Sequence, residues 1–216
     1  MKKTIAIILS LLMILSLAAC GNSSDQAKQP SAENNSAESG ADNADNAGTG
    51  TDNGQSARIL VAYFSATGTT EGVAEHIAAG LHGDLYEIVP KEPYTDADLN
   101  YNDDDSRTTT EMNDPDARPA ISGSVENMEQ YEIVFIGYPI WWGKAPRIVS
   151  TFVEGYDFSG KTIVPFCTSG GSGIGSSASD LKELTSGAQW LDGQRFGGSD
   201  SQDVVMEWVN GLGLNP

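Results

Sequence analysis

The stretch VAYFSATGTTEGVAEHIA, from Val61 to Ala78, decides the fold of this chain. It begins as an apolar strand and ends with the apolar spacing of a helix, and the turn between them, 65–70, carries four hydroxyl groups. Free backbone N–H groups at a helix N-terminus favour an anion, and Gly68 lets the backbone fold closely around one. The turn contains no lysine, unlike the loop that binds nucleoside triphosphates. We predict a bound monophosphate; simple capping of the helix by these hydroxyls is the alternative.

Strand and helix patterns alternate along the rest of the chain. Apolar runs, three of them nearly continuous, predict strands at 58–64, 85–89, 131–138, 161–167 and near 189–196. Apolar residues at helical spacing lie within 73–81, 148–156, 174–184 and 204–212. This alternation predicts an α/β fold with a mainly parallel sheet, in which ligands bind beyond the carboxyl ends of the strands. The segment 90–130 is acidic and has no strong period, so we expect a long excursion there with at most a short helix.

Two further loops follow predicted strands at the same edge of the sheet. The loop Pro139–Gly143 contains Trp141 and Trp142, and adjacent tryptophans in such a loop are costly unless they cover something flat or pack inward. We expect one of them to pack into the core. The loop Thr168–Ser172 is rich in glycine and offers backbone N–H and C=O groups at close range, as the polar edge of a heterocycle requires.

The three loops resemble the flavin-binding loops of the flavodoxin family, and Ser-Ala-Thr-Gly-Thr-Thr is similar to the family's phosphate loop. The resemblance covers residues 58–216. It implies a flavodoxin-like three-layer sandwich, with a five-stranded parallel sheet of order 2-1-3-4-5, and FMN as the cofactor. By this resemblance, the ribityl phosphate is held by Ser65, Thr67, Gly68, Thr69 and Thr70. The isoalloxazine ring is lined by Pro139, Ile140, Trp141, Trp142 and Gly143, and its pyrimidine side meets Thr168, Ser169, Gly170, Gly171 and Ser172.

The third loop departs from the family pattern. Flavodoxins typically carry a stacking tyrosine with nearby acids there, and Thr168–Gly175 contains no aromatic residue. An aromatic face and local negative charge disfavour the reduced, anionic flavin. Their absence leaves room for two-electron chemistry, as in flavodoxin-like quinone or NAD(P)H oxidoreductases.

The first twenty residues read as a targeting segment. Lys2 and Lys3 precede an uncharged aliphatic run, 5–17, which is too short for a comfortable bilayer span, and Leu-Ala-Ala-Cys follows it. This arrangement resembles the lipobox of bacterial lipoproteins, which implies cleavage before Cys20 and lipidation of its thiol. An ordinary signal peptide and an uncleaved anchor are the alternatives. Residues 21–57 contain no large apolar side chain and predict a disordered tether with a reach of roughly 30–40 Å.

The net charge of −18 excludes a nucleic-acid binder, because little on this chain would neutralise phosphates. His76 and His82 lie six residues apart without a cluster of other ligands, so we predict no metal site. The sequence contains no G-x-S-x-G motif of hydrolases, and we assign no catalytic residue. We expect an FMN-binding electron-transfer protein held at the membrane by lipid outside the cytoplasm, which exchanges electrons with a partner protein or a small molecule. An NAD(P)H- or quinone-dependent FMN oxidoreductase and a flavin-free binding module remain alternatives.

Overall fold

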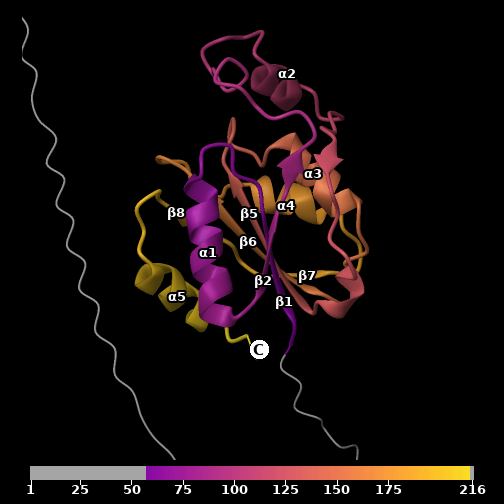
Figure 1. The fold of residues 1–216 in the computed structure, drawn as a ribbon, viewed down its shortest axis with the longest axis vertical. Helices are drawn as coiled ribbons and strands as arrows, with labels where there is room; N and C mark the ends of the chain where they lie inside the picture. The colour runs from indigo at the N-terminus through magenta and orange to yellow at the C-terminus, as the bar shows by residue number, and fades with distance from the viewer. Residues whose placement is uncertain (1–56, 215–216) are drawn as a thin grey trace, which may run out of the picture. The chain divides into compact units, whose positions relative to one another are not determined.

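The computed structural model describes residues 57–214. The predicted leader, the predicted lipidation site Cys20 and nearly all of the predicted tether lie outside the described residues. A parallel sheet forms the centre of the fold, with α1 (Thr69–Leu81) and α5 (Gln202–Gly211) on one face and α3 (Arg147–Glu154) and α4 (Ser177–Lys182) on the other (Figure 1). The strands of this sheet are β1 (Ile59–Tyr63), β2 (Asp84–Glu87), β5 (Ile133–Pro139), β6 (Thr162–Thr168), β7 (Gln189–Trp190) and β8 (Gln194–Phe196).

The strand order confirms the predicted topology. It runs β2-β1-β5-β6-β7, with β8 also paired to β6, so β7 and β8 together occupy the fifth position. The fifth strand is divided because Pro165, in β6, faces it and has no N–H to donate to the ladder. Pairing stops after Ile163, which accepts from the Leu191 N–H at 2.9 Å, and resumes at Phe166.

The nearly continuous apolar runs become strands that are covered on both faces. Alternate residues of β1 enter two different cores, because successive strand side chains point to opposite faces. Leu60 and Ala62 pack on the side of α3 and α4, and Val61 and Tyr63 pack on the side of α1 and α5. The predicted apolar face of the first helix is confirmed, since Val73, Ala74, Ile77 and Ala78 are buried.

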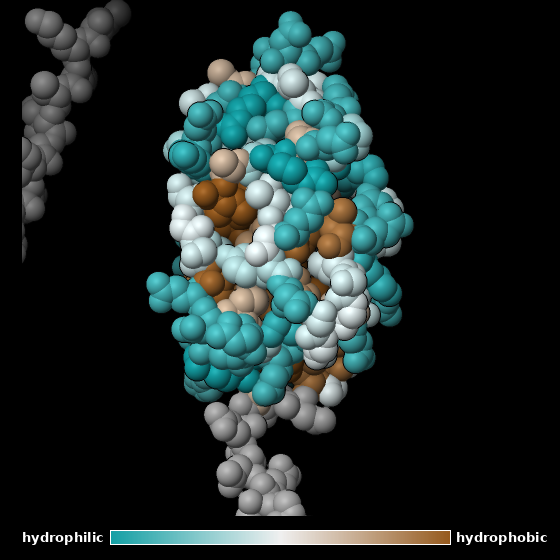
Figure 2. Space-filling view, turned by 90° about the vertical axis from the view of Figure 1, so that its right-hand side faces the viewer, coloured by the Kyte–Doolittle hydropathy of each residue, from teal (hydrophilic) through white to brown (hydrophobic). Residues whose placement is uncertain are grey.

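The excursion between β2 and β5 forms a small lobe above the carboxyl ends of the strands (Figure 1). It contains the expected short helix, α2 (Arg107–Asn113). The excursion also includes the two-stranded pair of β3 (Val89–Pro90) and β4 (Ile121–Ser122), and it returns to the amino end of β5 through the 3₁₀ turn η1 (Met128–Gln130). Figure 2 shows that the top of the molecule, where this lobe lies, has a predominantly hydrophilic surface. Between residues 57 and 214, none of the helices is long and apolar enough to cross a membrane.

Candidate functional site

The carboxyl ends of β1, β5 and β6 meet around one cleft of about 410 Å³. The register explains the meeting, because Tyr63 pairs with Gly137 and Pro139 pairs with Thr168. The predicted residues that line the cleft are Ser65, Thr67, Thr69, Thr70, Pro139, Ile140, Trp141, Thr168, Ser169 and Gly170. The predicted residues outside its lining are Gly68, Trp142, Gly143, Gly171 and Ser172, each of which belongs to one of the same three loops.

The first loop, Ser65–Thr70, ends at the N-terminus of α1. Gly68 occupies the cap position with φ of 81°, a left-handed conformation that glycine adopts without strain, and no side chain caps the helix. The first N–H groups of a helix have no partner within it, so those of α1 remain available at the cleft. The Thr67 and Thr69 hydroxyls lie 3.4 Å apart and exposed beside them. This end of the cleft therefore offers several neutral donors to an anion.

The Thr70 hydroxyl has a different environment. Its Oγ1 lies 2.8 Å from Oγ1 of Thr168, the last residue of β6, and the two residues are 1% and 3% exposed. A buried hydroxyl pair of this kind joins the first loop to the third. Thr70 therefore serves to fix the two loops relative to each other, whatever it contributes to a ligand.

The second loop separates the two tryptophans. Trp141 is half-buried and lines the cleft, and its ring packs edge-on against Phe64 and Tyr94 at centroid distances of 5.5 and 5.3 Å. Trp142 is 46% exposed and has φ of 47°. The expectation that one tryptophan packs inward is confirmed, and Trp141 is that residue.

The backbone around Trp142 is a tight hairpin turn. The N–H groups of Trp141 and Lys144 each donate to the other's carbonyl at 3.0 Å, and both central residues, Trp142 and Gly143, have positive φ. Such turns favour Asn-Gly, and a bulky residue at the first central position is strained. Trp142 is therefore both strained and exposed, and no core packing explains a tryptophan at this position.

The third loop is anchored by three hydrogen bonds at Ser169 and has free N–H groups after it. The Ser169 N–H donates to the Phe196 carbonyl at 3.2 Å, and the Ser169 hydroxyl donates to the Ser172 carbonyl. Nη2 of Arg195 donates to the Ser169 carbonyl at 2.5 Å. The N–H groups of residues 170–173 donate to no other described residue. The loop therefore presents a row of free backbone donors.

Three buried groups lie beneath the third loop. Burial raises the pKa of the Cys167 thiol to about 11, and Arg195 partly offsets the rise. Burial also raises the pKa of the Tyr138 hydroxyl, which lies 3.1 Å from that of Ser177. Nε of Arg195 is buried without a hydrogen-bond partner in the described chain. Cys167 and Tyr138 are therefore neutral near pH 7, and the nearby charges are those of Arg195, which acts on Cys167, and of Asp180, which acts on Tyr138.

Three residues that line the cleft were missed in the sequence, namely Ala66, Leu99 and Gly198. Gly198 follows β8, so the rule that places ligands beyond strand ends could have found it. Leu99 comes from the lobe between β2 and β5, and nothing in the local sequence indicated that it would reach the cleft.

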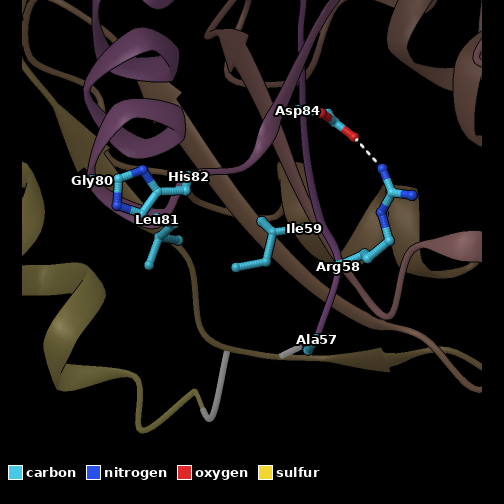
Figure 3. Close-up of a pocket in the computed structure, with 7 residues that line it drawn as sticks. All are labelled: Ala57, Arg58, Ile59, Gly80, Leu81, His82 and Asp84. Atoms are coloured by element: carbon cyan, nitrogen blue, oxygen red, sulfur yellow. Dashed lines mark hydrogen bonds and ion pairs between the residues drawn. The ribbon is translucent and has the colours of Figure 1, made fainter. Parts of the chain in front are cut away.

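A slightly larger hollow, of about 440 Å³, lies at the opposite end of the sheet (Figure 3). Its polar contact is the Arg58–Asp84 ion pair, at 3.0 Å with both side chains about half exposed. It borders Ile59, the first residue of β1, so it lies at the amino ends of the strands, away from the three loops. Among residues 57–214 there is also no group of three or more metal-binding side chains. Volume alone is a poor guide here, and we take the cleft as the candidate site.

The fold and the three loops define a flavodoxin-like α/β protein. Residues 58–212 match the sequence model described as Flavodoxin, and the chain belongs to the flavodoxin family. It is 51% identical to a provisionally assigned flavoprotein from Bacteroides eggerthii, over 72% of this chain and 97% of that one, with a TM-score of 0.68. A similar protein from Bacteroides uniformis is 42% identical over 72% and 99% of the two chains, with a TM-score of 0.69.

A flavoprotein from Lactobacillus acidophilus, whose structure was solved in complex with FMN, shares the fold. It is 23% identical over 71% of this chain and 99% of that one, with a TM-score of 0.54. No curated protein matches the chain.

Proposed function

We propose that the cleft binds FMN and that the protein transfers electrons through it. The observation that carries this proposal is the convergence, in one cleft, of neutral anion donors at α1, an apolar wall at Trp141 and free backbone N–H groups in the third loop. A volume of about 410 Å³ lies within the ~300–1,000 Å³ typical of small-molecule sites. The flavoproteins among the similar structures, one of them with FMN, support the same ligand.

The residues fit the three parts of FMN. Thr67, Thr69 and the first N–H groups of α1 would hold the phosphate, and no cation is needed because helix ends and hydroxyls bind monophosphates. Ile140 and Trp141 would contact the ring, and the N–H groups that follow Ser169 would meet its polar edge. When bound, the flavin accepts and returns electrons, and the chain's own residues bind it, orient it and set its potential.

We also propose that the domain is tethered to the membrane outside the cytoplasm through lipid on Cys20. The support is the charged start, the aliphatic run and the Leu-Ala-Ala-Cys sequence. An acyl anchor suits an acidic protein, because a strongly negative surface is not attracted to anionic lipids.

One observation favours the second candidate, an FMN-dependent oxidoreductase that works by two-electron steps. Arg195 forms no ion pair with any described carboxylate, and it donates to the third loop, which contains no aromatic or acidic residue between Thr168 and Gly175. A flavin ring gains negative charge on reduction, and a nearby cation stabilises that charge. Rapid bleaching of bound flavin by NADH or NADPH would favour this candidate over a simple carrier.

A comparison of FMN with riboflavin tests the first proposal. The chain is freed of flavin and titrated with each, and quenching of flavin fluorescence reports binding. We expect Thr67→Ala with Thr69→Ala to weaken FMN about ten- to a hundredfold, from about 0.7–1.4 kcal/mol for each hydroxyl, and to leave riboflavin nearly unchanged. The exposed Thr110→Ala change in α2 is the matched control. Failure of both flavins to bind would refute the proposal, and equal losses for both would refute the assignment of the phosphate site.

A further inference from the structure

A smaller hollow of about 100 Å³ lies on the other side of the Trp142 turn from the cleft. It is formed by the N-terminal part of α3, by α4 and by the segment that leads into β4. Its polar lining consists of Arg118, Lys144, Arg147, Ser150, Ser177 and Asp180.

This pocket concentrates positive charge on a strongly acidic protein. The chain carries a net charge of −18, yet three of the nine Lys and Arg residues between positions 57 and 214 line this pocket, and Asp180 is the one carboxylate among its lining residues. Of the three, Arg147 forms no ion pair with any described carboxylate, and its Nε and Nη2 donate to the carbonyls of Glu111 and Met112 at 3.3 and 3.1 Å. The charge of Arg147 is therefore met by carbonyl oxygens of the last turn of α2 and not by a carboxylate.

The other two cations are paired in different ways. Arg118 binds Glu154 through two parallel hydrogen bonds, of 2.6 and 2.8 Å, which fix its position. Lys144 pairs with Asp180, and their side chains are 45% and 43% exposed. A pair so exposed contributes little, so Lys144 can turn toward an anion at small cost.

The pocket and the cleft share one turn. Trp141 lines the cleft and Lys144 lines the pocket, and the two are joined by the paired hydrogen bonds of the hairpin. A group bound at Lys144 is therefore only a turn away from whatever occupies the cleft, with the exposed Trp142 between them.

We propose that this pocket binds a single phosphate group, either free phosphate or the phosphate of a nicotinamide nucleotide that exchanges electrons at the cleft. A volume of about 100 Å³ is far below the ~300–1,000 Å³ of small-molecule sites, so the pocket holds one tetrahedral group and not a whole nucleotide. Guanidinium and ammonium donors are those that recognise such a group. The nucleotide form of the proposal rests on the proposed function.

Phosphate binding is measured by calorimetry on the full chain saturated with FMN, so that the phosphate position at α1 is occupied. Lys144→Gln is expected to weaken phosphate about three- to tenfold, and Asp180→Asn to tighten it by a similar factor, as expected for a unit charge change in a partly exposed site. Both changes break the same ion pair, so a purely structural role would shift both variants in the same direction. Arg58→Gln, in the exposed pair at the opposite end of the sheet, is the matched control and should change nothing.

NADP⁺ and NAD⁺ then separate the two sources of the phosphate. Competition by NADP⁺, but not by NAD⁺, identifies the nucleotide's extra phosphate as the ligand, and phosphate binding without competition identifies the free ion. The proposal is overturned if FMN-loaded chain binds neither phosphate nor NADP⁺, or if the Lys144 and Asp180 variants change affinity in the same direction. A chain that binds no FMN would refute the proposed function, yet opposite responses of these two variants to phosphate would still support the pocket.

Discussion

The hydroxyl pair between Thr70 and Thr168 allows the junction of the first and third loops to be tested. The two oxygens are 2.8 Å apart and both residues are almost fully buried. Replacing either one by Val keeps the shape and leaves the other hydroxyl buried without this partner, which costs about 1–2 kcal/mol. In the double variant neither hydroxyl is present, so we expect the free energy of unfolding to fall by only about 1 kcal/mol in total. The coupling energy between Thr70 and Thr168 should then be about 1 kcal/mol or more.

Urea unfolding of flavin-free chain gives the four free energies of this cycle. Each 1 kcal/mol should shift Tm by roughly 2–4 °C for a chain of this size. Thr162→Val, at the half-buried start of β6, is the control and should change stability by less than about 0.5 kcal/mol. Because the Thr70 hydroxyl is already engaged, Thr70→Val should weaken FMN and riboflavin alike. Additive costs in the two single variants would refute the idea that this pair joins the loops.

Three further predictions concern the same end of the molecule. Trp142→Asn should raise Tm by roughly 2–4 °C, measured by thermal unfolding of flavin-free chain, because it relieves about 1 kcal/mol of backbone strain; an unchanged or lower Tm would contradict this. In a Cys20→Ser chain, Cys167 should resist alkylation at pH 8, and rapid alkylation of the folded chain at that pH would contradict this. The free energy of unfolding should fall as the pH rises from about 9 toward 11, because the folded state holds the Cys167 thiol proton more tightly than the unfolded state does. Arg195→Gln should lower the two-electron midpoint potential of bound FMN by about 20–40 mV, the size expected for the loss of one partly screened positive charge near the ring. An unchanged potential would remove the argument for two-electron chemistry.

Much of the fold was readable in the sequence because it depends on periodicity. Strands covered on both faces must be apolar throughout, and the first, third and fourth predicted strands match β1, β5 and β6 within two residues at each end. The division of the fifth strand was not predicted. It depends on whether the nitrogen of Pro165, which carries no hydrogen, faces β5 or the fifth strand. The pairing register decides this, and the local sequence does not.

The candidate site was readable to a smaller degree. The first and third loops could be located because a strand end and a glycine or hydroxyl pattern coincide there. Which tryptophan packs inward depends on Phe64 and Tyr94, and Tyr94 lies in a lobe whose path has no periodic signal. Leu99 reaches the cleft from the same lobe and was missed for the same reason. Both contacts join residues that are far apart in the sequence, and they come from a segment without regular secondary structure. Local sequence patterns do not predict contacts of this kind.

The acidity of the chain and a phosphate ligand are compatible because they act over different distances. Repulsion from the net charge of −18 is spread over the surface and is screened beyond about 8–10 Å at physiological salt. Inside that distance the anion would meet hydroxyls and helix N–H groups in the first loop, and cations beside Asp180 in the smaller pocket. The neutral donors of the first loop need no counter-charge, which frees lysine and arginine for positions around the Trp142 turn. On the two proposals above, the distribution of charge would separate a cofactor bound by hydroxyls and helix N–H groups from an exchangeable anion bound by cationic side chains.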